Sequence, residues 1–114
     1  MANFYGLCSS LSVTVLLAIA ASPLAAQIVP DTSLPQNSIV VPNDNIFVID
    51  GGTAAGSNLF HSFASFSVPL ETTAFFNSSP LVQTIFARVT GDNISSIEGT
   101  IAAPGNLFLL NPNG

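Results

Sequence analysis

The sequence predicts an all-β fold for the part of the chain that follows its first 26 residues. Seven short runs there are rich in β-branched and aromatic residues, which is typical of β-strands. Gly, Pro, Asn, Ser and Thr separate the runs at short intervals, and these residues favour reversals of the chain. Apolar residues do not recur at spacings of three and four over a helical length, so no sustained helix is predicted.

The first 26 residues have the pattern of a secretory signal peptide. Their apolar run, Leu11–Ala21, has eleven residues, whereas a membrane-spanning helix needs about 20. Ala25 and Ala26 suit signal peptidase, so we expect cleavage after Ala26 and no stable membrane insertion. A buried apolar strand or helix is the alternative reading. The predicted organisation is a signal peptide at residues 1–26 and one domain at residues 27–114.

The first two predicted strands, Ser38–Val41 and Ile46–Ile49, enclose the turn-forming sequence Pro-Asn-Asp-Asn at residues 42–45. Asp50-Gly51-Gly52 then predicts a second reversal, because Asp bonds its own backbone and Gly accepts positive φ.

The third predicted strand, Phe63–Val68, ends at Pro69, a residue that a central strand does not tolerate. Phe60, Phe63 and Phe66 recur every three residues, a spacing that a helix also permits. The intervening serines are poor helix formers, so we read the segment as strand or loop.

Thr73–Phe76 and Thr84–Val89 are the fourth and fifth predicted strands, with Pro80 between them. Four apolar residues of Pro80–Val89 would also share one face of two helical turns. A short helix over Pro80–Val89 is therefore an equal alternative to the fifth strand.

Ile94–Ile101 and Leu107–Leu110 are the last two predicted strands, and Pro104 lies between them. Short apolar runs broken by single glycines suit the coils of a parallel β-helix, in which each coil stacks on the next. A β-sandwich fits the pattern equally well. No internal repeat is visible that would decide between the two.

Composition excludes several functions. Six acidic residues, one arginine and no lysine give a net charge of −5, so the chain cannot neutralise the phosphates of a nucleic acid. The one cysteine, Cys8, lies in the predicted signal peptide, so no disulfide is expected. His61 is the only histidine, too few for a zinc site with three or four ligands. We expect no metal and no other cofactor, and we read His61 as a structural or surface residue.

No catalytic residue is predicted. The G-x-S-x-G elbow is absent, and a lysine-dependent phosphate loop is impossible. Asp50 and Glu71 form a carboxylate pair only in the sense that any two acids do. Arg88 is expected to neutralise Asp92 or Glu98 on the surface, an interaction worth about 0–1 kcal/mol. The chain is therefore not expected to be an enzyme.

The phenylalanines are expected to form the core, because buried aromatic rings stabilise a chain without disulfides. A ligand-binding apolar groove is the alternative. The residues concerned are Phe60, Phe63, Phe66, Phe75, Phe76 and Phe86.

Several short segments follow one another in an order typical of one known family. They are Gly51-Gly52-Thr53, Gly56–Phe63, Phe66–Pro69, Thr73–Asn77, Arg88–Gly91, Ile94–Gly99 and Asn106–Gly114. Because it contains these segments in this order, the chain resembles the amino-terminal secretion domain of two-partner-secretion exoproteins. This is the filamentous-haemagglutinin amino-terminal, or haemagglutination-activity, domain.

The resemblance implies the amino-terminal part of a right-handed parallel β-helix with an amino-terminal cap, preceded by the signal peptide. It implies export to the periplasm by the Sec machinery, then passage through an outer-membrane β-barrel transporter that recognises the domain. The product would be secreted or held at the cell surface. Secretion domains of that family are longer than this chain, so residues 27–114 are expected to be a partial domain, truncated at the carboxyl end.

The implied function is secretion and targeting of a large β-helical exoprotein, with no catalysis by this domain. A direct binding module of a cell-surface adhesin is the alternative. A β-helical carbohydrate-active enzyme is a remote one, because it needs clustered carboxylates or a cation beside the sugar.

The segment Asn111-Pro112-Asn113-Gly114 has the residues of a type I turn in the preferred order. The resemblance implies that these four residues are a secretion motif. A simple turn between coils is the other reading of the same residues.

Overall fold

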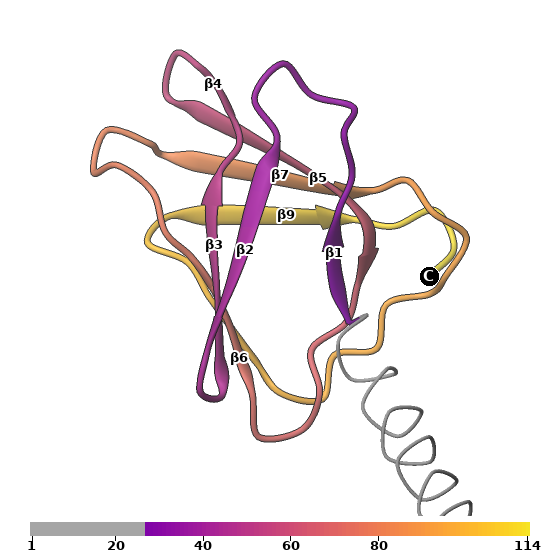
Figure 1. Ribbon diagram of the computed structural model, residues 1–114. Helices are drawn as coiled ribbons and strands as arrows, with labels where there is room; N and C mark the ends of the chain where they lie inside the picture. The colour runs from indigo at the N-terminus through magenta and orange to yellow at the C-terminus, as the bar shows by residue number, and fades with distance from the viewer. Residues whose placement is uncertain (1–26) are drawn as a thin grey trace, which may run out of the picture.

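A computed structural model describes residues 27–114, which form nine strands and no helix (Figure 1). The all-β prediction is confirmed for this part of the chain, and no helix in it is long and apolar enough to cross a membrane. The predicted signal peptide lies outside the described residues. The strands are β1 Ile28–Pro30, β2 Ser38–Asn43, β3 Ile46–Gly51, β4 Thr53–Ala55, β5 Asn58–Phe66, β6 Thr73–Phe76, β7 Thr84–Val89, β8 Thr100–Ala102 and β9 Asn106–Leu110.

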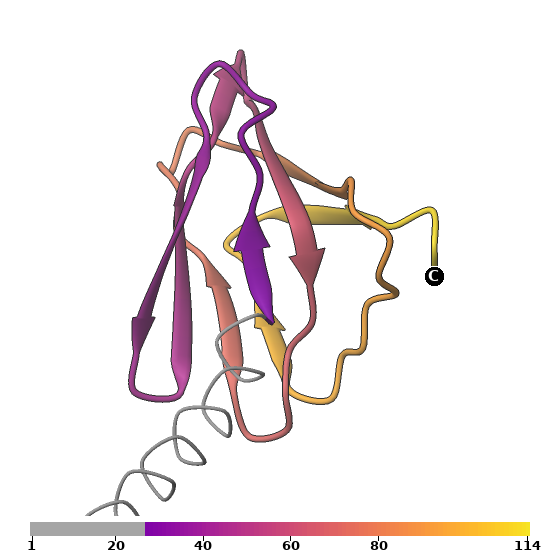
Figure 2. The same cartoon turned by 45° about the vertical axis from the view of Figure 1, so that its right-hand side comes forward.

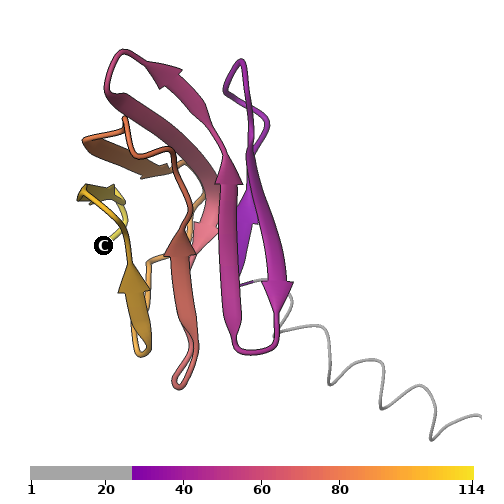
Figure 3. The same ribbon diagram turned by 90° about the vertical axis from the view of Figure 1, so that its left-hand side faces the viewer.

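One sheet has the order β2-β3-β6-β8, and Figure 3 shows these strands side by side. β3, β6 and β8 are parallel, so that Ile46, Thr73 and Thr100 occupy equivalent positions in successive strands. β2 pairs with β3 in the antiparallel direction and lies at the edge of the sheet.

The second sheet is built in the same way from β5, β7 and β9, which are parallel and stacked one on the next (Figures 1 and 2). Asn58, Thr84 and Asn106 occupy equivalent positions in these three strands. The chain alternates between the two sheets, so each return adds one strand to each of them.

Antiparallel strands pair with the first strand of each parallel ladder, which is β3 in one sheet and β5 in the other. β2 pairs along β3, while β1 and β4 pair with the edge of β5 that faces away from β7. Exposed strand edges are templates for pairing with other chains, so this cover protects the end of the stack nearest residue 27. Within the described residues, β8 and β9 each have one edge without a strand partner.

The core lies between the sheets because side chains alternate along each strand. In β7, Ile85, Ala87 and Val89 are buried, and the residues between them face outward. An aromatic cluster fills the centre: the ring centroid of Phe66 lies 5.2 Å from that of Phe63 and 5.9 Å from that of Phe76. These three rings are fully buried, which confirms half of the predicted aromatic core.

The other three phenylalanines of that prediction, Phe60, Phe75 and Phe86, face outward, and their assignment to the core was wrong. Phe60, Phe86 and Phe108 stack in register across the outside of β5, β7 and β9, with centroids 5.3 and 5.4 Å apart. Phe75 is exposed on the other sheet. The cause is strand alternation, which turns Phe75 outward between the buried Ala74 and Phe76.

Two predicted strands, Thr73–Phe76 and Thr84–Val89, are confirmed with their bounds, and the alternative helix over Pro80–Val89 is wrong. The strands at Ser38, Ile46 and Leu107 are confirmed with ends that differ by one or two residues. The short strands β1 and β4 were not predicted.

The prediction Ile94–Ile101 is largely wrong. Only Thr100 and Ile101 of this run belong to a strand, and Ile97 forms an isolated parallel bridge with Val68. At Gly99 an added Cβ would collide with the carbonyl oxygens of Pro69 and Thr72. The backbone at Gly99 therefore packs directly against the backbone of segment 69–72. The predicted strand Phe63–Val68 begins and ends too late, because β5 extends from Asn58 to Phe66.

Candidate functional site

The segment 111–114 forms a closed turn directly after β9. The Gly114 N–H donates to the Asn111 carbonyl oxygen over 3.1 Å, the hydrogen bond expected of a β-turn. The Asn113 N–H donates to Oδ1 of Asn111 over 2.9 Å. Asn111 therefore stabilises its own turn through both its backbone and its side chain.

The two asparagines of this turn also hold the preceding coil. Nδ2 of Asn111 donates to the Asn93 carbonyl oxygen (3.0 Å) and to Oγ of Ser95 (2.9 Å). Nδ2 of Asn113 donates to the Gly91 carbonyl oxygen over 2.7 Å. In return, the Ser95 N–H donates to the Gly114 carbonyl oxygen over 2.8 Å. We call Asn111, Asn113 and the segment 91–95 the asparagine clasp.

The clasp exists because β7 and β9 are parallel neighbours, so the segments that leave them meet at the same edge of the sheet. Segment 91–95 contains no strand, and its carbonyl oxygens need partners from elsewhere. The asparagine amides supply two of them. The four residues therefore form a turn and also connect this turn to segment 91–95. The sequence predicted only the turn.

A second polar cluster surrounds Asp31, directly after β1. Its carboxylate accepts hydrogen bonds from the hydroxyls of Thr90 (2.6 Å), Ser62 (2.7 Å) and Ser33 (2.7 Å). Its backbone N–H donates to the Ser62 carbonyl oxygen over 3.1 Å. Asp31 therefore joins the segment after β1 to β5 and to the end of β7.

Hydrogen bonding controls the charge state of this cluster. Partial burial acts to raise the pKa of Asp31, but the bonds from Thr90, Ser62 and Ser33 outweigh it and hold the pKa well below the usual value of 3.8. The contribution of Asp31 to stability is therefore complete above the usual carboxyl range and is lost as the pH falls through and below it.

Asp31→Asn is expected to lower the free energy of unfolding by about 1–2 kcal/mol, because the amide is a weaker acceptor for the hydroxyls of Ser62 and Thr90. Hydrogen exchange should increase most in segment 31–37. Asp92→Asn is the matched control, since Asp92 is exposed and makes no side-chain hydrogen bond within the described residues. Equal exchange in the two variants would contradict this role for Asp31.

Arg88 does not neutralise Asp92 or Glu98, and that expectation was wrong. Its Nε donates to Oγ of Ser62 (2.9 Å) and its terminal nitrogen to Oγ of Ser33 (2.8 Å). Both hydroxyls bond to Asp31 in turn, so two serines connect the cation to the carboxylate. β-pairing between β5 and β7 places Arg88 opposite Ser62, which explains this choice of partner.

His61 is a structural residue inside the core. Nδ1 lies 2.8 Å from Oγ of Ser38, which also accepts the Ser62 N–H over 3.1 Å. Nε2 is buried without a hydrogen-bond partner, and the ring packs against Phe63 and Phe76. Burial lowers the pKa of His61 to about 4, against a smaller opposing effect of Asp50. The absence of a side chain at Gly52 leaves room for the ring, since a Cβ there would lie 2.9 Å from Cε1 of His61.

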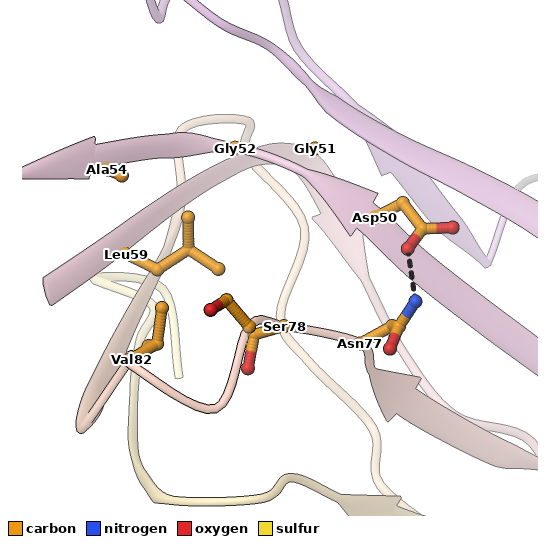
Figure 4. A pocket seen from close by; sticks show the side chains of 9 residues that line it. Asp50, Gly51, Gly52, Ala54, Leu59, Asn77, Ser78 and Val82 are labelled. Atoms are coloured by element: carbon orange, nitrogen blue, oxygen red, sulfur yellow. Dashed lines mark hydrogen bonds between the residues drawn. The ribbon is translucent and has the colours of Figure 1, made fainter. Parts of the chain in front are cut away.

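An open hollow of about 500 Å³ lies between Asp50 and Val82 (Figure 4). Asp50 contributes its only carboxylate, and Oδ1 of that group accepts a hydrogen bond from Nδ2 of Asn77 over 2.7 Å. Glu71 is not among its lining residues. The hollow therefore lacks the paired carboxylates that glycoside hydrolysis requires. Within residues 27–114 no group of three or more His, Cys, Asp or Glu side chains could hold a metal ion.

Comparison with known proteins gave one result. A family model described as "TPS secretion domain" matches residues 26–114, which includes both sheets, the Asp31 cluster and the asparagine clasp. No curated protein and no solved structure matches the chain.

Proposed function

The chain belongs to the TPS secretion domain family, and we propose from this membership that it directs an exported protein into its two-partner transporter. Membership implies a role in secretion and targeting and a transporter in the outer membrane as the partner. We propose further that the transporter recognises this domain directly and that the domain has no catalytic activity. The family match over residues 26–114 is the observation that carries this proposal.

The proposed route begins with removal of residues 1–26 by signal peptidase after Sec export. The apolar run Leu11–Ala21 and the small residues Ala25 and Ala26 support this step. The family match begins at residue 26, which agrees with a domain boundary there. The chain would then cross the periplasm and the outer membrane to the medium or the cell surface.

We propose that residues 27–114 form the amino-terminal part of a right-handed parallel β-helix of the filamentous-haemagglutinin type. The parallel ladders β3-β6-β8 and β5-β7-β9, to which each turn of the chain adds one strand, support this arrangement. β1, β2 and β4 would form its amino-terminal cap, since they cover the first strand of each sheet in the antiparallel direction.

Binding measurements test the recognition step. The secreted form of the chain should bind its cognate transporter in lipid nanodiscs, and it should not bind an outer-membrane porin reconstituted in the same way. Biolayer interferometry gives both affinities. Equal binding to the two barrels, or none to either, would contradict recognition of this domain.

The asparagine clasp is proposed to shape the coil that the transporter recognises. Asn111→Ala and Asn113→Ala each remove side-chain bonds to segment 91–95, at an expected cost of about 0.5–2 kcal/mol in stability. This cost is too small to unfold the domain. We therefore expect secretion to fall sharply in both variants while the β-type circular dichroism persists.

The matched control is Asn106→Ala, because Asn106 is exposed on β9 and its side chain makes no hydrogen bond within the described part of the chain. The assay compares secreted with periplasmic protein in the presence of the transporter. Normal secretion of both clasp variants would reduce the motif to a structural turn.

A further inference from the structure

The outward side of the sheet β2-β3-β6-β8 is apolar and uncovered within the described residues. Val41, Val48, Phe75 and Ala102 lie side by side across its four strands, because each is the register partner of the next. Ile39 and Ile46 lie on either side of this row and also face outward. We call these six residues the outer apolar face.

The exposure of this face is unusual for its sequence. β3 carries the continuous apolar run Ile46–Ile49, a composition typical of strands that are buried on both sides. Here only one side of the sheet is buried, the side that carries Phe47 and Ile49. On the outward side, Ile39 is 54% exposed and Val41 is 47% exposed. Contiguous apolar side chains left in water mark an interaction site rather than an ordinary surface.

The outer side of the other sheet differs. There Phe60 and Phe86 of the aromatic stack border a smaller hollow of about 230 Å³, and Leu34 from the segment after β1 forms part of its wall. The same segment is fixed by the Asp31 cluster. That surface is partly occupied by the chain itself, whereas no segment of the described chain lines the outer apolar face.

Charge selects the occupant. Asp44 and Glu71 lie exposed in the turns at the Ile46 end of the face, and Asp50 lies beside Ile39 at the other end. The only cationic side chain, Arg88, lies on the opposite sheet. A second copy of the chain would bring carboxylates against carboxylates, with a net charge of −5 on each copy. A partner surface with an apolar strip flanked by Lys and Arg would complement both the apolar row and the carboxylates at its ends.

We propose that the outer apolar face is the surface by which this chain docks on its outer-membrane transporter, at an apolar strip bordered by basic residues. The identity of this partner rests on the proposed function; the location and chemistry of the surface rest on the structure. The carboxylates steer the encounter, and burial of the apolar row supplies most of the affinity.

The test compares two double variants in the binding measurement described above. Ile39→Thr with Val41→Thr removes apolar surface from the face but keeps β-branched side chains. Phe108→Thr with Leu110→Thr is the control on the other sheet, where the two residues are 53% and 54% exposed. The face variant is expected to bind the transporter at least about tenfold more weakly, and the control is expected to bind like the wild type.

Two single variants test the charge of the partner. Ile39→Lys and Ile39→Glu both remove the apolar side chain, but only the lysine opposes basic residues, so Ile39→Lys should bind more weakly than Ile39→Glu. Ile46→Thr, at the other end of the face, is also expected to weaken binding. It replaces the double variant in the test if circular dichroism shows that the double variant is unfolded.

The outcomes separate the two claims. A wild-type chain that does not bind contradicts the proposed function itself. A wild-type chain that binds while all face variants bind equally well contradicts the docking surface alone. Loss of a dimer in the face variants, seen by analytical ultracentrifugation, would assign the face to self-association and overturn the proposal. Weaker binding of Ile39→Glu than of Ile39→Lys would overturn the basic character of the partner.

Discussion

Phe63→Ala is expected to lower the free energy of unfolding by about 3–5 kcal/mol, the largest effect of any single change considered. The Phe63 ring is fully buried and lies within 5.2 Å of Phe66 and 6.4 Å of Phe76, measured between centroids. Alanine would leave a cavity that the two sheets cannot close. Because small domains are stable by about 5–15 kcal/mol, the variant should be close to unfolding.

Urea denaturation followed by circular dichroism measures this loss. Phe108→Ala is the matched control, since Phe108 is 53% exposed and stacks only against Phe86. We expect the control to lose about 1 kcal/mol or less. A loss at Phe108 equal to that at Phe63 would show that the space between the sheets is not the core.

The second large effect is loss of stability in mild acid. The pKa of His61 is about 4 in the folded chain and 6.5 in an unfolded one, so the unfolded chain binds the proton more readily between these values. Stability is therefore complete above about pH 6.5, decreases as the pH falls towards 4, and decreases no further from this group below it. The difference corresponds to about 3 kcal/mol.

Chemical denaturation at several pH values between 4 and 7 measures this slope. In His61→Leu the group that titrates is gone, so the slope should disappear while the Ser62 N–H keeps its bond to Oγ of Ser38. The unfolded Asp31 carboxyl, with its usual pKa of 3.8, begins to bind protons only as the pH approaches 4, so the slopes of the two chains are compared above about pH 5. An unchanged slope in His61→Leu would assign the acid sensitivity to another group.

The strands that could be predicted are those in which composition and alternation agree. Thr73–Phe76 and Thr84–Val89 are β-rich and alternate between buried and outward residues. β5 was harder, because polar residues, among them Asn58, His61 and Ser62, interrupt its apolar positions. The buried positions Leu59, His61 and Phe63 alternate from its start, and reading His61 as an inward residue would have extended the strand.

Composition gave a wrong prediction where contact with a neighbouring segment determines the backbone conformation. Ile94–Ile101 is rich in β-branched residues, yet Gly99 fits against the carbonyl oxygens of Pro69 and Thr72, which no local pattern reveals. Phenylalanine content likewise indicated a core without indicating which side of a sheet each ring occupies. That information lies in the alternation and register of the strands, which phenylalanine content does not carry.

The candidate site shows the same limit. Turn chemistry predicted the closed turn at Asn111–Gly114, because it depends on four consecutive residues. The partners of the two amides lie in segment 91–95 and follow only from the parallel register of β7 and β9. The Asp31 cluster joins residues up to 59 positions apart and has no sequence pattern of its own.

The measurement that tests the central claim most directly is secretion of the chain with and without its transporter. With the transporter, we expect the chain in the medium or at the cell surface, with an amino terminus at or near Gln27 by mass spectrometry. Without the transporter, the same cleaved chain should remain in the periplasm. Export to the outside that does not depend on the transporter would contradict the account.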